Sequence, residues 1–236
     1  MKITSLQNEH VKYWVSLGEK KVRDKDRRFL IEGDHLISEA EKLGLIIETI
    51  SVVDETKDYF VTKSIMKKIS KQQSISYNAA VARMLPEDSI SGNVLILDCL
   101  QDPGNLGTII RSAIAFNFHT IVLSDDSVDL YNPKVIRSTE GMIFNINCLR
   151  RNLKEFIPVL KNLGYKIYGT DIKNGTDVRD IPKTNIAITI GNEGNGLSSS
   201  VKKECDEYLY LPMNKTCESL NAGVAASILM YEVNHD

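Results

Sequence analysis

The chain has 236 residues, 42% of them hydrophobic, which is more than one domain usually needs, so we expect two domains. Its formal net charge is −2, so a polyanionic partner would have to be held by a local basic patch. The four cysteines form no CxxC pair and have no histidine near them at zinc-finger spacing, which excludes a zinc finger, and we expect no metal. The first residues are polar and no apolar run approaches the roughly 20 residues of a membrane span, so we expect a reduced, cytoplasmic protein without a membrane partner.

The N-terminal stretch 1–28 combines a helical pattern with an excess of cations. A run of this kind is most often a solvated helix face. Residues 29–31 then read as a short strand, 36–43 as an amphipathic helix and 45–53 as a second strand. This order predicts a small domain of mixed α/β structure.

The polar, turn-rich stretch that ends at Gly92 predicts a linker. We therefore expect a first domain over 1–86, a linker over 87–92 and a second domain over 93–236. Beyond the linker, strands and helices alternate, which predicts an α/β fold with a parallel sheet. The predicted strands are 94–98, 120–124, 144–148, 166–170, 186–190 and 208–211, and the predicted helices are 105–116, one from 132, 153–163, one from 198 and the final helix.

Three stretches of this second domain share one design of apolar strand, polar loop and helix. They are 94–116, 186–208 and 209–231, and their loops are rich in Gly, Asn and Ser. In an open parallel sheet the loops that leave the carboxyl ends of the strands form the ligand crevice, so we expect these loops to converge. Small residues at a helix start often mean only tight helix packing, which stays an alternative.

Two common nucleotide-binding motifs are absent from these loops. The loop from Gly191 reads GxxGxG, whereas a Rossmann fold needs GxGxxG directly after a strand. A phosphate-binding loop of the form GxxxxGK followed by Ser or Thr is also missing. The crevice is therefore expected to take a different ligand.

The three loops resemble the three ordered signatures of the SpoU, or TrmH-like, branch of the SPOUT class of RNA methyltransferases. The matching residues are Asp102-Pro-Gly-Asn-Leu-Gly with Arg111, then Gly191-Asn-Glu-Gly with Gly196, then Leu211-Pro-Met with Ser219-Leu-Asn. The resemblance implies a parallel α/β sheet whose C-terminal segment forms a deep trefoil knot around S-adenosylmethionine, a rare exception to the rule that chains do not thread loops. It also implies a homodimer with the active site completed near the subunit interface.

The resemblance implies methyl transfer to a ribose 2′-hydroxyl and assigns five candidate catalytic residues: Asn105, Arg111, Glu193, Ser219 and Asn221. A 2′-hydroxyl is a weak nucleophile, so the site must position it and either remove its proton or stabilise the alkoxide. In the family, the residue that matches Arg111 is proposed as the general base. A guanidinium is almost always protonated, so phosphate binding or alkoxide stabilisation is the easier role for it.

Each of these residues also has a plain structural interpretation. The alternative for Arg111 is a surface or helix-capping arginine. The alternative for Asn105 is a helix N-cap instead of a group that orients Arg111 or a hydroxyl. Glu193 would hold Arg111 or accept a proton, or else be a turn residue in a solvated loop. Ser219 and Asn221 would orient the reacting groups, the alternative being that Ser219 caps the last helix.

By the same resemblance, Gly191, Leu211 and Leu220 hold S-adenosylmethionine through their backbone, and Thr170, Ile190 and Met213 line its pocket. The stretch FLIEGDHLISEA is similar to the small substrate-binding domain that often precedes SpoU catalytic domains. Beside such an enzyme the basic residues become candidates for RNA phosphate contacts. They are Lys12, Lys21, Arg23, Arg27, Arg28, Lys134 and Arg137.

Two residues depart from the usual family pattern. Asn117 follows Phe116 where Gly is common, and Asn tolerates the positive φ that such a turn needs. Glu140 replaces a small or apolar residue and leaves the details of the substrate open. We expect 23S ribosomal RNA as the substrate, with transfer RNA second. The alternative function is a catalytically silent, knotted RNA-binding or ribosome-assembly protein.

Overall fold

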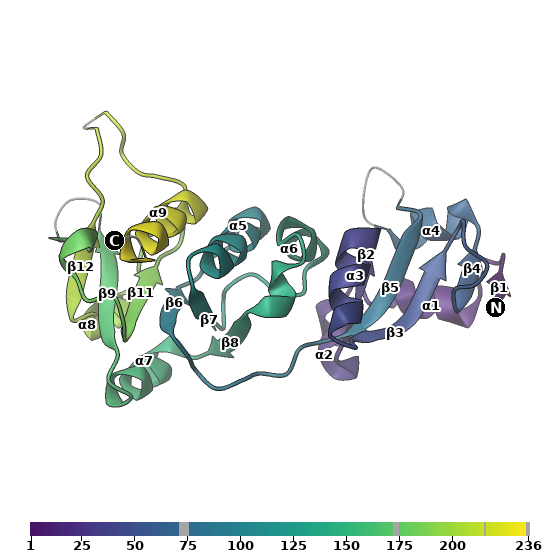
Figure 1. Cartoon of the computed structure of the whole chain (residues 1–236), viewed down its shortest axis with the longest axis horizontal. Helices are drawn as coiled ribbons and strands as arrows, with labels where there is room; N and C mark the ends of the chain where they lie inside the picture. Colours follow the sequence, from purple (N-terminus) through teal and green to yellow (C-terminus); the bar gives the residue numbers. More distant parts are fainter. Residues whose placement is uncertain (71–75, 172–174, 215, 235–236) are drawn as a thin grey trace. The chain divides into compact units, whose positions relative to one another are not determined.

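The computed structural model describes residues 1–70, 76–171, 175–214 and 216–234 (Figure 1). The chain divides into two compact units. The first unit consists of Met1–Pro86 and Asp129–Phe144, and the second of Glu87–Val128 and Asn145–Asp236. A segment from the middle of the sequence therefore belongs to the same unit as the N-terminal residues.

The first unit contains a mixed five-stranded sheet in the order β1-β4-β3-β5-β2. Strands β1, β4 and β3 are parallel, whereas β5 pairs antiparallel with both β3 and β2. The strands are β1 (Lys2–Ile3), β2 (Arg28–Glu32), β3 (Ile46–Ser51), β4 (Tyr59–Val61) and β5 (Asn78–Arg83).

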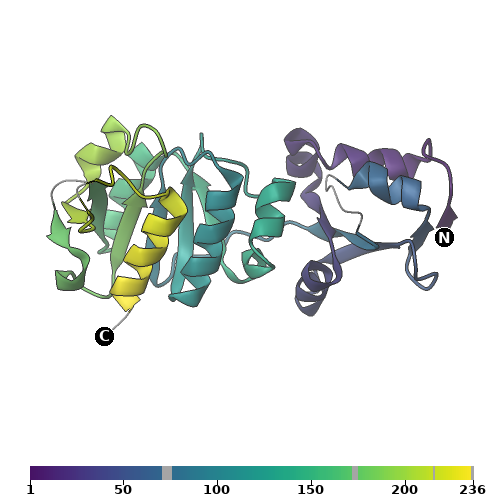
Figure 2. The ribbon, with the colours of Figure 1, turned by 90° about the horizontal axis from the view of Figure 1, so that it is seen from above.

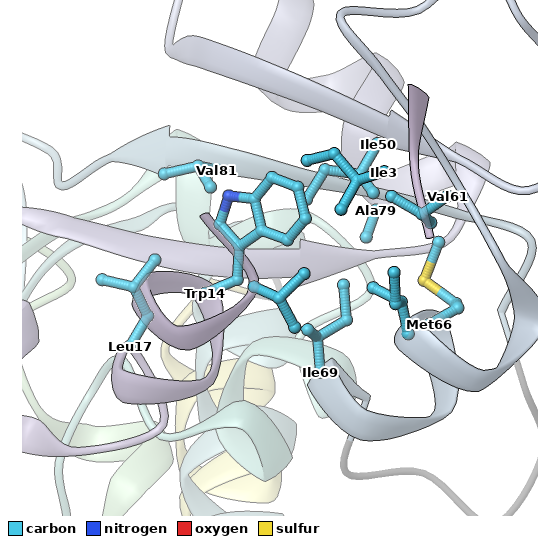
Figure 3. Close-up of a cluster of buried hydrophobic side chains, with 11 residues drawn as sticks. Ile3, Trp14, Leu17, Ile50, Val61, Met66, Ile69, Ala79 and Val81 are labelled. Atoms are coloured by element: carbon cyan, nitrogen blue, oxygen red, sulfur yellow. The ribbon is translucent and has the colours of Figure 1, made fainter. Parts of the chain in front are cut away.

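Helices cover both faces of this sheet. Trp14 of α1 (Glu9–Ser16) and Met66 of α4 (Lys63–Ile69) are buried with Ile50, Ala79 and Val81 of the sheet (Figure 3). The other face is covered by α3 (Asp34–Lys42) together with α6 (Pro133–Ser138). Helix α2 (Lys20–Asp26) precedes β2. The sheet alternates its apolar side chains between the two cores, as a two-sided sheet requires.

The second unit contains a seven-stranded sheet in which every pair is parallel, in the order β10-β12-β9-β11-β6-β7-β8. This confirms the predicted α/β class with a parallel sheet. The strands are β6 (Asn93–Leu97), β7 (Phe118–Ser124), β8 (Asn147–Arg151), β9 (Lys166–Asp171), β10 (Thr176–Asp177), β11 (Ile186–Ile190) and β12 (Glu207–Tyr210).

The helices of the second unit form a layer on each side of the sheet (Figure 2). Helices α7 (Leu153–Asn162) and α8 (Ser199–Glu204) bury Ile157 and Val201 against one face. Helices α5 (Pro103–Ala115) and α9 (Ala222–Asn234) lie side by side on the other. Short 3-10 turns occur at Met142–Asn145 (η1) and Val178–Asp180 (η2).

The stretch 87–92, predicted as a linker, is bound to the second unit. Glu87 forms an ion pair of 2.6 Å with Arg151, and the backbone of Asp88 and Ser89 is bonded by the Asn147 side chain. Farther along, the Tyr165 hydroxyl donates to the carbonyl of Gly92. These contacts fix the segment that leads into β6.

Two elements differ from the sequence prediction for identifiable reasons. The strand predicted at 144–148 begins instead at Asn147, because Ile143 and Phe144 are apolar for packing into the core of the first unit. The alanine-rich β5 was not predicted, since alanine has low strand propensity. It forms because it pairs with a strand on each side.

The described helices include none that is long and apolar enough to cross a membrane. The four cysteines are free thiols. Burial raises the pKa of Cys148 to about 12 and also raises the pKa of Cys205. Both thiols are therefore protonated at neutral pH and poor nucleophiles.

The core of the first unit can be tested through Trp14, the single tryptophan of the chain. We expect Met66→Ala to lower the free energy of unfolding of this unit by about 2–5 kcal/mol, because Met66 is fully buried and its loss leaves a cavity. Urea unfolding followed by Trp14 fluorescence measures it. The control is Val53→Ala, at a side chain that is 63% exposed, which should change the value by less than about 0.5 kcal/mol. Equal effects of the two substitutions would contradict this packing.

Candidate active site and cofactor pocket

A hollow of about 770 Å³ lies in the second unit, lined by β9, β11, β12, the loops that follow β11 and β12, and the start of α9. Its wall combines apolar side chains such as Leu209 and Leu229 with charged ones such as Lys202 and Glu218. All six residues predicted to bind the cofactor line it: Thr170, Ile190, Gly191, Leu211, Met213 and Leu220. Thr170 is fixed by a hydrogen bond of 2.9 Å from its hydroxyl to the carbonyl of Thr189.

The loop 191–196 is held in shape by the side chain of Asn192. Its Oδ1 accepts the backbone N–H groups of Gly194 and Asn195, both at 3.0 Å, and its Nδ2 donates to the carbonyl of Cys99 at 2.9 Å. Sequence reasoning did not assign Asn192 a role. Asn in a glycine-rich turn commonly bonds the backbone two residues on, so this signal was available.

Three predicted catalytic residues form one hydrogen-bonded chain. Asn105 Nδ2 donates to Glu193 Oε1 at 2.9 Å, and Asn221 Nδ2 donates to Asn105 Oδ1 at 2.8 Å. Asn221 Oδ1 in turn accepts the backbone N–H of Gly223 at 2.9 Å. The polar chain thus joins the loop after β11, the start of α5 and the start of α9, which confirms that the three loops converge.

The Glu193 carboxylate is the acceptor for several donors. Its oxygens accept the backbone N–H groups of Gln101 at 3.2 Å and Asp102 at 3.1 Å, in addition to Asn105. Burial by itself would raise the pKa of Glu193, but these hydrogen bonds outweigh it and lower the pKa. Glu193 is therefore ionised at neutral pH and anchors the loops.

Arg111 lies apart from this chain of side chains. It is exposed on α5, does not line the hollow and makes no hydrogen bond or ion pair with any residue that the structure describes. The suggestion that Asn105 or Glu193 holds Arg111 is therefore wrong for a single subunit, because their polar atoms are bonded to each other and to the backbone.

The helix caps also differ from the alternatives considered. Asp102, not Asn105, is the N-cap of α5 and accepts the N–H of Asn105. Helix α9 begins at Ala222, later than predicted, and Asn221, not Ser219, accepts the N–H groups of its first turn. Ser219 is exposed and lines the hollow. The departure at Asn117 keeps its turn, since Asn117 has a φ of 57°.

The profile of the SpoU rRNA Methylase family matches residues 92–231, which is more than half of the chain. The chain belongs to the SpoU rRNA methylase family. The profile of the MRM3-like substrate binding domain matches residues 8–80. The chain is also 39% identical to the 23S rRNA (guanosine(2553)-2′-O)-methyltransferase RlmP of Bacillus subtilis, and the match covers 98% of each chain.

Solved structures of SpoU relatives have the same fold. The AdoMet-bound rRNA methyltransferase from Sinorhizobium meliloti is 26% identical with a TM-score of 0.88, covering 99% of this chain and 97% of that chain. AviRb, a SpoU methyltransferase from Streptomyces viridochromogenes in complex with AdoMet, is 25% identical with a TM-score of 0.84, covering 96% and 97%. The comparisons confirm the predictions of an S-adenosylmethionine-dependent RNA 2′-O-methyltransferase of this family.

The basic residues predicted to contact RNA all lie in the first unit of this SpoU protein. Lys12, Lys21, Arg27 and Lys134 are exposed, and Arg28 and Arg137 are half-buried. Arg23 is only 3% exposed, donates to the carbonyl of Leu17 at 2.8 Å and forms a buried ion pair with Asp129. The prediction for Arg23 is corrected, because its guanidinium is used inside the fold.

Gly191 offers a test of the pocket. A Cβ at Gly191 would stand 2.3 Å from the carbonyl carbon of Gly196, so Gly191→Ala must displace the loop 191–196. We expect calorimetry to show at least a tenfold loss of S-adenosylmethionine affinity, about 1.4 kcal/mol. Gly194→Ala is the matched control, since its Cβ would meet nothing nearer than 3.6 Å. A pocket built differently would show equal affinities for the two variants.

The hydrogen bonds to Glu193 can be tested by carboxyl NMR titration. We expect a midpoint for Glu193 below the usual value of about 4.3. Because the folded pKa is the lower one, ionised Glu193 stabilises the fold above pH ~4.3, and this stabilisation is lost as the pH falls through the folded pKa. Asn105→Ala should raise the midpoint, whereas Asn195→Ala, in the same loop, should not. A midpoint that ignores Asn105→Ala would contradict the assigned bond.

Proposed function

We propose that this SpoU protein transfers a methyl group from S-adenosylmethionine to a ribose 2′-hydroxyl of 23S ribosomal RNA. The observation that carries the proposal is the hydrogen-bonded chain Glu193–Asn105–Asn221 beside the hollow, in which each side chain has partners on both sides. The RNA is supported by the Bacillus subtilis relative, whose name specifies 23S rRNA and 2′-O transfer and which matches almost the full chain.

The lining of the hollow fits S-adenosylmethionine. A neutral adenine suits apolar neighbours such as Ile190 and Leu211, and backbone groups of a glycine-rich loop can recognise its edge without charged side chains. We assign the backbone of Gly191, Leu211 and Leu220 to holding the cofactor, with Thr170 and Met213 lining the pocket. When bound, the cofactor supplies a methyl group on a positively charged sulfur.

The roles of the polar residues follow from their partners. Glu193 is a poor proton acceptor, because its lowered pKa and its engaged oxygens oppose protonation. Glu193, Asn105 and Asn221 therefore position the loops. Ser219, which lines the hollow with an exposed side chain, orients the ribose. Arg111 stabilises the alkoxide or the neighbouring phosphate as a permanent cation.

A homodimer and the C-terminal knot are part of the proposal. Val224, Ile228 and Tyr231 of α9 are 45%, 37% and 41% exposed, and their spacing puts them on one side of the helix. An apolar stripe of this kind is typical of a surface that is covered by a partner. A second subunit would bring Arg111 of one chain toward the site of the other, since Arg111 does not line the hollow of its own chain. A cytoplasmic location is supported by the four free thiols.

The decisive experiment is methylation of purified RNA by the purified protein. We expect labelled S-adenosylmethionine to modify 23S rRNA from a strain that lacks the gene, and the phosphodiester bond on the 3′ side of the methylated ribose to resist alkaline cleavage. Methylation of transfer RNA alone would replace the proposed substrate. Binding of RNA without methylation would favour the silent RNA-binding alternative.

The role of Arg111 gives a kinetic prediction. We expect Arg111→Ala to lower the methylation rate by about 10²-fold or more, because a charge that acts in the transition state is lost. S-adenosylmethionine affinity by calorimetry should barely change. The control is Arg179→Ala, which removes an exposed arginine that pairs with Asp177, and it should leave the methylation rate unchanged. An equal loss of rate and of cofactor affinity would refute the assignment.

A further inference from the structure

Two arginines face each other at one end of the sheet of the first unit. Arg28 is the first residue of β2 and stands opposite Arg83, the last residue of β5, in the antiparallel register. Opposed residues in such a pair have Cβ atoms about 4.5–5.5 Å apart, and like charges there are destabilising. Neither guanidinium forms an ion pair with a carboxylate of the described part of the chain.

Both arginines belong to the same face of the sheet. Leu30 and Val81, the next residues on that face of each strand, pack against the core around Trp14. Strand alternation therefore puts Arg28 and Arg83 beyond the edge of this core. Arg28 is half-buried and Arg83 is exposed. Partial burial strengthens the interaction of Arg28 with any charge that comes close.

A third arginine is held at the same end. Arg27 ends α2 in a left-handed conformation, with a φ of 54°, and its carbonyl accepts the N–H of Met84 at 2.9 Å. Its exposed side chain reaches the carbonyl of Leu85 at 3.3 Å. We call Arg27, Arg28 and Arg83 the arginine cluster. The hydrogen bonds between β2 and β5 hold the backbones of Arg28 and Arg83 side by side, and the bond from Met84 holds the backbone of Arg27 next to them.

Three other arginines of the chain have donors that are used by the fold. Arg150 donates to the carbonyls of Ser124, Asp125, Ser127 and Val128, and Arg151 pairs with Glu87. Arg23 is buried against Asp129. Among the described residues, the partners of the arginine cluster are the carbonyl of Leu85 for Arg27 and the Tyr13 hydroxyl beside Arg28. Neither partner is a carboxylate, so most donors of the cluster remain available to a ligand.

We propose that the arginine cluster binds a phosphodiester of the RNA substrate, an inference that rests on the proposed function. A phosphate between Arg28 and Arg83 would relieve their repulsion, and the guanidinium fork matches two phosphate oxygens. Arg83, to which sequence reasoning gave no role, is thereby a substrate-binding residue. The register of the sheet places the backbones of Arg28 and Arg83 opposite each other, so that both guanidinium groups can reach one phosphate.

The test is the salt dependence of RNA binding by the full chain, with a 23S rRNA transcript as the probe. We expect Arg83→Ala to weaken binding and to reduce the slope of log affinity against log salt by about 1, as for one lost phosphate contact. Lys57→Ala removes an exposed cation that follows the opposite end of β3, and its slope should not change. Arg83→Lys should keep the slope and lose part of the affinity.

A second measurement separates ligand binding from a structural role. Because Arg83 faces a like charge, Arg83→Ala should keep or raise the urea midpoint at low salt. A lowered midpoint with an unchanged slope, or equal slopes for Arg83→Ala and Lys57→Ala, would overturn the proposal. If the wild type binds the transcript but does not methylate it, the proposed function fails, while the slopes still decide the arginine cluster.

Discussion

The carboxylate of Glu193 is the interaction on which the geometry of the site depends. It accepts hydrogen bonds from the loop before α5 and from Asn105 of α5. Asn105 in turn connects it to Asn221, just before α9. Glu193 and Asn105 are 88 residues apart in the sequence, and Asn105 and Asn221 are 116 apart. One anion with several N–H donors joins these distant residues, since charge-assisted hydrogen bonds are stronger than neutral ones. The shape of the hollow follows, because the same loops form its rim.

The parallel sheet explains why much of this site could be predicted from the sequence. Carboxyl ends of parallel strands meet at one edge, so the loops after β6 and β11 had to be neighbours once the strands were recognised. What the pattern could not give is which partner each polar atom has. Ser219 and Asn221 are both residue types that commonly cap a helix. Only the backbone path of the folded chain decides that Asn221 accepts the N–H groups at the start of α9.

Errors of prediction came from residues whose surroundings are supplied by distant parts of the chain. Arg23 stands in a basic run that looks solvated, yet Asp129 meets it in the folded chain. Phe144 was predicted to begin a strand of the second unit, because local patterns do not reveal which core an apolar residue joins. Arg111 shows the opposite limit, since its guanidinium has no partner among the described residues and only the family resemblance gave it a role.

The return of residues 129–144 to the first unit restricts how this protein can be divided or recombined. A gene fragment for 1–86 alone would leave Arg23 without Asp129, a buried unpaired charge of the kind that costs about 3–5 kcal/mol. A fragment that lacks only residues 1–86 would expose Ile136, Ile143 and Phe144 to water. Exchange of the first unit between family members therefore requires three junctions, one after residue 86 and one at each end of 129–144. Residues 1–86 and 129–144 therefore have to be exchanged as one set, although each of the two units has a core of its own.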